Sequence, residues 1–188
     1  MSSFKCVVLG DAEVGKTTML TAYSLGQESK LKVSENNFQV TVTVKDKPYT
    51  LSLLDTTGDV DFKTRKRPNY ADVDAFLLLF SVVSPASFVN IREKWLPDIL
   101  IHARNTPFFI VGTNIDLRDN TDTLNKLTEQ GEKPVTETEG RQLAQRLRAS
   151  KYLECSSLTL KGLDKVFEEV ILALKSPPPA ASRNCVVV

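Results

Sequence analysis

One short stretch near the N-terminus, Gly10 to Thr17, constrains this chain more than any other. Its order is Gly-Asp-Ala-Glu-Val-Gly-Lys-Thr: a glycine, four residues, and then Gly-Lys-Thr. The apolar run 6–9 before it predicts a buried strand, and 18–23 after it predicts the start of a helix. Glycines let backbone N–H groups turn inward around an anion, and the positive end of the helix faces the same anion. A glycine turn that matches by chance is the alternative, and the flanking strand and helix disfavour it.

This pattern is typical of loops that bind the phosphates of a nucleoside triphosphate. In such loops the lysine, here Lys16, reaches the outer phosphates, and the hydroxyl of Thr17 holds Mg²⁺. The loop residues predicted to bind nucleotide are Gly10, Asp11, Ala12, Glu13, Val14, Gly15, Lys16 and Thr17.

The size and net charge of the chain limit the classes of protein to which it can belong. The 188 residues are enough for one domain with a full core, and a net charge of +1 gives no electrostatic basis for binding nucleic acid. No apolar run approaches the ~20 residues of a membrane-spanning helix, and the N-terminus lacks a signal-peptide pattern. We therefore expect a protein made in the cytosol with reduced cysteines, of which Cys6 and Cys155 behave as small buried hydrophobes.

Strand and helix patterns alternate along most of the chain. The predicted strands are 6–9, 38–45, 49–54, 75–80, 107–111 and 152–155. The second and third form a hairpin around Asp46-Lys47. Helices are predicted from Pro85 to about 104, from Thr136 to about 150 and over 163–174, with a short exposed helix inside 119–134. This alternation predicts an α/β fold, with a six-stranded, mostly parallel sheet flanked by helices on both faces.

Three further polar segments follow predicted strands, at the sheet edge where ligands bind in such folds. In Asp55-Thr56-Thr57-Gly58, the Asp55 carboxylate is placed to hold Mg²⁺ through a water and the Gly58 N–H to meet a γ-phosphate. Alone, this segment would be better explained as a turn. The other two are Thr113-Asn114-Ile115-Asp116 and Cys155-Ser156-Ser157-Leu158.

The base is predicted to be guanine. The carboxylate of Asp116 can accept hydrogen bonds from the N1–H and 2-amino groups of guanine, whereas adenine offers neither donor. Taken alone, Asp116 also fits a helix cap or a surface charge. The four segments in this order favour a guanine nucleotide, GTP or GDP, bound with Mg²⁺.

In this order the segments resemble those of a small GTPase of the Ras superfamily, within the Rho family. The stretches 80–85, 93–95, 152–156 and 119–134 resemble the Rac and cell-division-cycle branches most closely. The resemblance implies the P-loop small-GTPase fold over 1–174, two switch loops that differ between the GTP and GDP states, and a Rho-type helical insertion at 119–134. It adds Thr18 to the phosphate and metal site and Lys16 to the catalytic residues, and it places around the base Thr113, Asn114, Asp116, Leu117, Ser156, Ser157 and Leu158.

Two departures from this family concern hydrolysis. Similar proteins have glycine where Ala12 stands, and a methyl group there would crowd the γ-phosphate and an incoming arginine finger. They have glutamine, which orients the attacking water, where this chain has Asp59. We therefore predict very slow GTP hydrolysis. The alternative is that Asp59 acts as an unusual base that positions the water.

A third departure lies in the first switch loop, 27–37. Relatives have an aromatic residue stacked on guanine near the position of Glu28, and a threonine that closes over Mg²⁺. Here the loop is about two residues shorter, and Ser34 is the candidate replacement for that threonine as a metal ligand. Loss of the stacked ring predicts fast nucleotide exchange. Fast exchange with slow hydrolysis would leave the protein mostly bound to GTP.

The C-terminus predicts a lipid anchor. Residues 175–188 are interpreted as a flexible, Pro-rich tail, and Cys185-Val186-Val187-Val188 fits the prenylation pattern, with Cys185 as the lipidated residue. A merely apolar end is the alternative. Only Lys175 and Arg183 add positive charge, so one lipid should bind membranes reversibly. We expect a location on the cytoplasmic face of the plasma membrane or endomembranes, with a cytosolic pool.

The leading hypothesis is therefore a prenylated guanine-nucleotide switch that signals to the actin cytoskeleton, cell polarity or membrane traffic. Its expected partners are effectors, exchange factors and a GDP-dissociation inhibitor. A second hypothesis is a non-cycling scaffold with a structural nucleotide. A third, a P-loop kinase, is disfavoured because Asp116 fits guanine and the sequence indicates no acceptor site.

Overall fold

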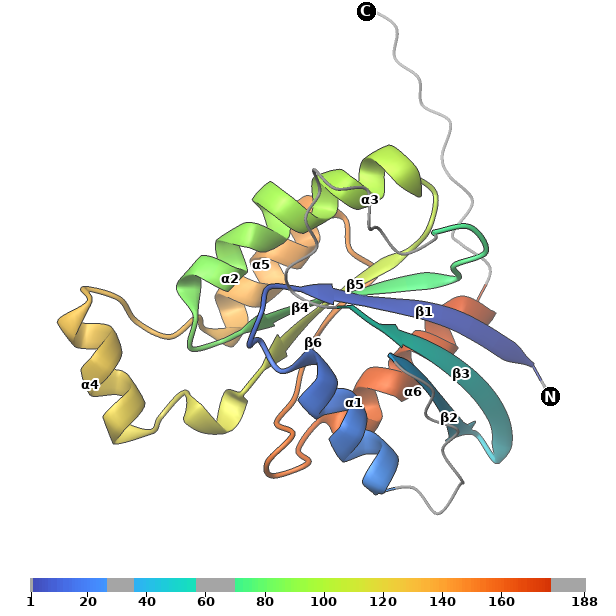
Figure 1. Cartoon of the computed structure of the whole chain (residues 1–188), viewed down its shortest axis with the longest axis horizontal. Helices are drawn as coiled ribbons and strands as arrows, with labels where there is room; N and C mark the ends of the chain where they lie inside the picture. Colours follow the sequence, from blue (N-terminus) through green and yellow to red (C-terminus); the bar gives the residue numbers. More distant parts are fainter. Residues whose placement is uncertain (1, 27–35, 57–69, 177–188) are drawn as a thin grey trace, which may run out of the picture.

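A computed structural model describes residues 2–26, 36–56 and 70–176, and the strands within them form one six-stranded sheet (Figure 1). The strand order across the sheet is β2-β3-β1-β4-β5-β6. Only the β2–β3 pair is antiparallel. The strands are β1 (Ser3–Gly10), β2 (Asn37–Val44), β3 (Lys47–Asp55), β4 (Ala75–Ser81), β5 (Phe108–Thr113) and β6 (Lys151–Glu154). This confirms the predicted fold class.

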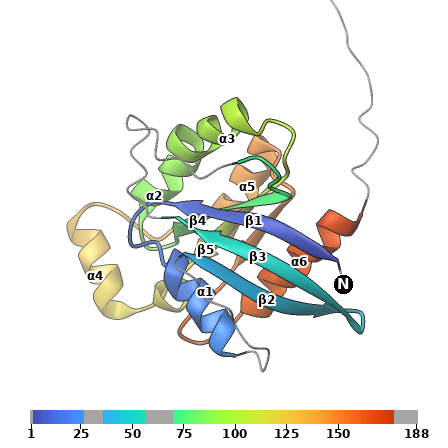
Figure 2. The ribbon, with the colours of Figure 1, turned by 45° about the vertical axis from the view of Figure 1, so that its right-hand side comes forward.

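Helices cover both faces of the sheet because its central strands are apolar on both sides. Every residue of β4 is buried. One core cluster joins the sheet to α1 (Lys16–Leu25) and α6 (Leu163–Lys175). A second cluster joins the other face to the helices between β4 and β5 and to α5 (Glu137–Leu147). Figure 2 shows the two helix layers on opposite sides of the sheet.

The hairpin between β2 and β3 turns one residue earlier than predicted. Val44 pairs with Lys47, so Lys45 and Asp46 form the two-residue turn and Lys47 already belongs to β3. Both turn residues have positive φ, 50° and 62°. Two-residue turns with positive φ at both positions match the right-handed twist of the flanking strands. The expectation of Asp46-Lys47 was wrong because neither turn residue is a glycine or asparagine that would mark the position.

The helix predicted from Pro85 to about 104 is divided into three parts. These are α2 (Pro85–Asn90), a π-helical turn η1 (Ile91–Trp95) and α3 (Leu96–His102). Ser84 caps the start as predicted, and Pro85 occupies the first turn. The π turn ends two residues before Pro97. The proline ring has no N–H to donate and clashes with the carbonyl four residues earlier in a regular helix.

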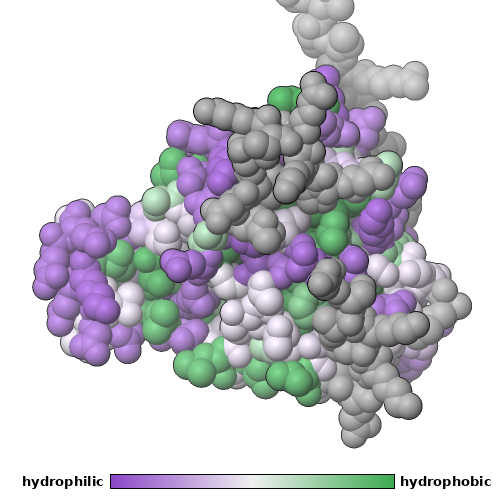
Figure 3. All heavy atoms as spheres, viewed as in Figure 1, coloured by the Kyte–Doolittle hydropathy of each residue, from purple (hydrophilic) through white to green (hydrophobic). Residues whose placement is uncertain are grey.

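The remaining helices agree with the predictions apart from their ends. Thr136 and Glu139 form the predicted capping box, but α5 ends at Leu147, because Arg148 adopts a left-handed conformation (φ 58°). The exposed helix expected within 119–134 is α4 (Thr121–Glu129), which projects as a hydrophilic arm with only Leu127 buried (Figures 1 and 3). Cys155 is buried, but it follows β6 instead of ending it.

The environments of Cys6 and Cys155 predict slow thiol chemistry. Burial and the nearby charge of Asp74 raise the pKa of the Cys6 thiol to about 12, and burial with the charges of Glu154 and Asp116 does the same for Cys155. At pH 8 a Cys185→Ser variant should react with a disulfide reagent roughly 1,000-fold more slowly than free cysteine, because so little thiolate is present. Absorbance stopped-flow measures the rate, with the guanidinium-unfolded variant as control. Rapid labelling of the folded protein would contradict the expectation.

Among residues 2–26, 36–56 and 70–176, the longest apolar helical stretch falls short of what crossing a membrane requires.

Candidate functional site

The loop between β1 and α1 needs glycine at both of its ends. A Cβ atom on Gly10 would lie 2.4 Å from the backbone oxygen of Leu79 on the neighbouring strand. Gly15 has a left-handed conformation (φ 90°) and caps α1 without any side-chain hydrogen bond to the helix. The first N–H groups of α1 therefore face the loop without a competing side chain, as an anion site requires.

Lys16 lies across this loop. It is buried, with 6% of its surface exposed, and its Nζ donates hydrogen bonds to the backbone oxygens of Gly10 (2.8 Å) and Asp11 (2.7 Å). The ammonium group is thus held at the mouth of the loop by the loop's own carbonyls. This is the position from which a lysine can reach a bound phosphate.

Thr17 and Asp55 fit a Mg²⁺ ion. The Thr17 hydroxyl donates a hydrogen bond to Asp55 Oδ2, which joins the start of α1 to the end of β3. The other oxygen, Asp55 Oδ1, is buried and has no hydrogen-bond partner within the described part of the chain. A buried carboxylate oxygen without a partner is costly, and hard oxygen ligands of this kind suit Mg²⁺. Bound there, the ion would neutralise phosphate charge.

The loop after β5 is tied directly to the phosphate loop. The hydroxyl of Thr113 lies 2.6 Å from the Val14 backbone oxygen and 3.0 Å from that of Phe80. Asn114 has a left-handed backbone (φ 59°), and its amide donates to the hydroxyl of Ser81 (2.9 Å). Hydrogen bonds therefore join the segment predicted to recognise the base to the segment predicted to bind phosphate.

The third segment meets the second at Asp116. The buried Ser156 hydroxyl donates to Asp116 Oδ1 (2.5 Å) and accepts from the N–H of Thr159 (3.0 Å). This fixes one carboxylate oxygen and leaves Asp116 partly exposed, in the short helical turn Ile115–Leu117. Leu158 is 80% exposed, so only a bound ligand or partner would cover it.

The structure thus brings the predicted residues of 10–18, Asp55, 113–117 and 156–158 to the carboxyl edge of the sheet. The predicted residues Ser34, Gly58, Asp59 and Cys185 lie outside the described residues. A family model, described as the Ras family, matches residues 5–176. The chain belongs to the Ras family. It is therefore a small GTPase, a class of guanine-nucleotide switch that binds GTP and GDP with Mg²⁺ and interacts with regulators and effectors.

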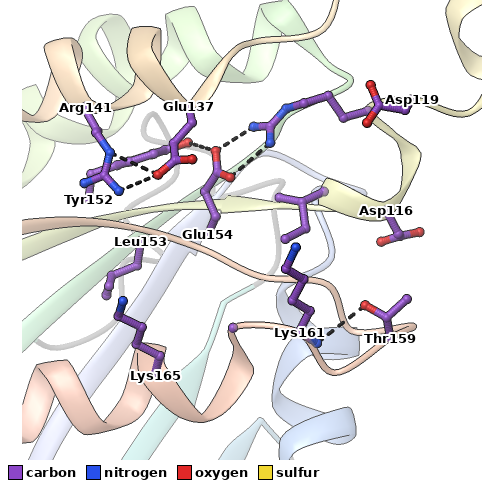
Figure 4. Close-up of a pocket in the computed structure, with 13 residues that line it drawn as sticks. Asp116, Asp119, Glu137, Arg141, Tyr152, Leu153, Glu154, Thr159, Lys161 and Lys165 are labelled. Atoms are coloured by element: carbon purple, nitrogen blue, oxygen red, sulfur yellow. Dashed lines mark hydrogen bonds and ion pairs between the residues drawn. The ribbon is translucent and has the colours of Figure 1, made fainter.

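Behind Asp116, this Ras-family domain has a charged cavity of about 510 Å³ (Figure 4). At its centre Arg118 makes two hydrogen bonds to Glu154 (2.5 and 3.0 Å), and the Tyr152 hydroxyl donates a third (2.7 Å). Burial raises the pKa of Glu154, but the hydrogen bonds and charge of Arg118 outweigh it, so that the pKa lies below its usual value. Arg118 also donates to the Val135 backbone oxygen (3.1 Å), so the pair braces the loop that carries Asp116.

Replacing Glu154 with glutamine should therefore destabilise the protein in a pH-dependent way. The carboxylate has a lowered pKa in the folded state, so its contribution is present above the pKa of about 4.3 in the unfolded chain and is lost as pH falls further. At pH 7 we expect Glu154→Gln to lower the free energy of unfolding by about 2 kcal/mol. Urea unfolding from pH 7 to pH 3.5 measures it, and the difference from the parent should shrink at the acid end.

Glu137 offers a matched control, because it pairs with Arg141 in the same cavity but both side chains are more than half exposed. Glu137→Gln should change the free energy of unfolding by less than about 0.5 kcal/mol. An equal effect of the two substitutions would contradict the bracing role of Glu154.

Several residues at the site escaped sequence reasoning. Ser81 holds Asn114, and the Thr56 hydroxyl donates to the Val8 backbone oxygen (2.6 Å), which fixes the end of β3 on β1. Their only sequence signal is a hydroxyl at the end of an apolar strand. Asn90 and Trp95, which contact Asp11, lie far away in the sequence and carry no local signal.

Proposed function

We propose that this Ras-family protein is a membrane-associated switch of the Rho type that is mostly bound to GTP and hydrolyses it very slowly. The observation that carries the proposal is a set of hydrogen bonds at the sheet edge. Thr113 bonds to Val14 in the loop that carries Lys16, and Ser156 bonds to Asp116 in the loop after β5. A phosphate site and a base site that are joined by hydrogen bonds fit the two ends of a single nucleotide. The hydrophilic helix α4 lies inside the segment 119–134 and supports the Rho-type assignment.

Slow hydrolysis is supported by the position of Ala12. This residue of the phosphate loop is exposed, whereas Val14 and Lys16 of the same loop are buried. Its methyl group is thus open to solvent, and we propose that it crowds the γ-phosphate and an arginine finger. Asp59 adds a negative charge where the family has a water-orienting glutamine, and fast exchange rests on Glu28 and Ser34. Asp59, Glu28 and Ser34 lie outside the described residues, so they support the proposal through the sequence alone.

The domain proposed over 1–174 would carry the switch, and the tail 175–188 would carry a prenyl group on Cys185. Lys175 ends α6 and donates a hydrogen bond to the Tyr49 hydroxyl, so Arg183 is the basic residue of the tail beyond the helix, and membrane binding would be reversible. The proposed location is the cytoplasmic face of the plasma membrane or endomembranes, with a cytosolic pool. Its partners would be effectors, exchange factors and a GDP-dissociation inhibitor, in signalling to actin, polarity or membrane traffic.

The test is the nucleotide that remains on freshly purified protein. We expect guanine nucleotide in a stoichiometric amount, mostly GTP, when it is released by acid and separated by ion-exchange chromatography. A preparation with neither GTP nor GDP, and no binding in titration, would refute the proposal. GDP alone would refute the GTP-loaded part of it. A non-cycling scaffold, which Ala12 also fits, predicts bound GTP that is neither hydrolysed nor exchanged over days.

A further inference from the structure

The carboxylate of Asp11 is turned away from the phosphate loop and held by three side chains of one helix. Its Oδ2 accepts a hydrogen bond from the Asn90 amide (2.6 Å), and its Oδ1 accepts one from the Trp95 indole (2.9 Å). Lys94 Nζ lies 3.6 Å from the same Oδ1 and 4.5 Å from the centre of the Trp95 ring. We define these three residues, Asn90, Lys94 and Trp95, as the Asp11 clamp.

The π turn makes this clamp possible. Residues five apart in a regular α-helix point in directions about 140° apart, since each residue adds about 100°. In the η1 turn the hydrogen bonds span five residues, as between the Leu96 N–H and the Ile91 oxygen, which brings such residues onto one side. Asn90 and Trp95, five apart, can therefore face one carboxylate. A regular helix would present only one of them.

The clamp is connected to the nucleotide site through a single residue. While its side chain binds the clamp, the backbone oxygen of Asp11 accepts the hydrogen bond from Lys16 Nζ. Any shift of Asp11 therefore moves an acceptor of the lysine that is placed to reach the phosphates. A short path from η1 to Lys16 runs through the Trp95–Asp11 and Lys16–Asp11 hydrogen bonds, and Trp95 is fully buried.

The charge of Asp11 also needs the clamp. A carboxylate in a loop built for anions repels phosphate unless its charge is compensated. The two hydrogen bonds and the nearby Lys94 hold the carboxylate, which is 20% exposed, on the helix side of the loop and compensate that charge. Without them the side chain is free to turn toward the phosphates.

We propose that Asn90, Lys94 and Trp95 are positioning residues for the phosphate loop, and that they set the rate at which bound nucleotide leaves. This rests on the proposed binding of guanine nucleotide at that loop. It also makes η1 a route by which a protein partner on α2 or α3 would change nucleotide release, because α2 and α3 continue directly from the clamp.

An exchange of donor and acceptor tests the clamp. Asn90→Asp places two carboxylates face to face, and Asp11→Asn leaves the two donors competing for one oxygen. Each variant should release a fluorescent GDP analogue about 10–100-fold faster than the parent in millimolar Mg²⁺. The double variant restores both bonds, since the new amide at position 11 donates to the new carboxylate at 90 and accepts from Trp95. Its release rate should return to within about threefold of the parent.

Two further variants keep the test decisive. Trp95→Phe keeps an aromatic ring, although a smaller one, at this buried position and removes the N–H, so it should speed release by about tenfold even where the charge variants fold poorly. Arg92→Gln changes an exposed neighbour that pairs with Glu93, and it should leave the rate unchanged. Thermal unfolding of every variant separates a loss of stability from a change in release.

The release rates of these variants distinguish the clamp from the proposed function. Faster release in both single variants with rescue in the double variant supports the clamp. Unchanged release in the single variants, or a double variant as fast as the two effects combined, overturns the clamp and leaves the proposed function intact. A parent protein that retains no guanine nucleotide overturns the proposed function and the clamp together.

Discussion

Replacing Asp116 with asparagine is expected to weaken GDP binding by roughly 10⁴-fold. Guanine presents two donors to this position, and the carboxylate has two acceptor oxygens, one of which is already oriented by Ser156. An amide offers only one acceptor and sets an N–H group against the 2-amino group of the base. A buried donor without a partner costs more than the lost hydrogen bond itself, which is why the expected effect is large.

The same variant should gain affinity for xanthosine diphosphate. Xanthine has a carbonyl in place of the 2-amino group, so the amide at 116 donates to it and accepts from the ring N–H. Titration of both nucleotides by calorimetry measures the reversal. Asp119→Asn is the matched control, because Asp119 is an exposed carboxylate of the charged cavity and should leave both affinities unchanged. Equal GDP binding by Asp116→Asn and the parent would rule out base recognition at this residue.

Much of the fold is predictable because its signals are local. The apolar run of β4 and the Gly-Lys-Thr sequence each identify an element from consecutive residues. The rule that parallel strands present their carboxyl ends at one edge then brings Lys16 and Asp116 together without any knowledge of side-chain positions. The turn at Lys45 and the division of the long helix at η1 depend on backbone conformations that cannot be predicted from these residue types.

The contacts that hold the site are less predictable, because they join residues that are distant in the sequence. Thr113 meets Val14 across 99 positions, and Trp95 meets Asp11 across 84. Sequence patterns placed Asp11 in the phosphate loop but gave no direction for its side chain. That direction depends on a π turn whose effect is visible only after folding.

The double substitution Ala12→Gly with Asp59→Gln should raise GTP hydrolysis more than any other change in this chain. Ala12 has no positive φ angle, so glycine is not required there by the backbone, and removing the methyl group should cost less than about 1 kcal/mol of stability. The methyl group of Ala12 is exposed, and under the proposed function it would crowd an incoming arginine finger. The new glutamine restores an amide that orients water.

The two substitutions should act together. The Asp59→Gln variant alone orients water but still hinders the arginine finger, and the Ala12→Gly variant alone admits the finger but lacks oriented water, so each should recover only part of the acceleration. The double variant should recover roughly 10³-fold or more with an arginine-finger activator of the Rho type. Single-turnover release of phosphate from GTP-loaded protein measures the rate, with and without the activator. Lys126→Gln on the exposed arm α4 is the control and should leave the slow rate unchanged. If the parent already responds to the activator at the rate of the double variant, then Ala12 and Asp59 do not impair hydrolysis, because the finger reaches its position past the methyl group and the aspartate supplies the water-orienting function.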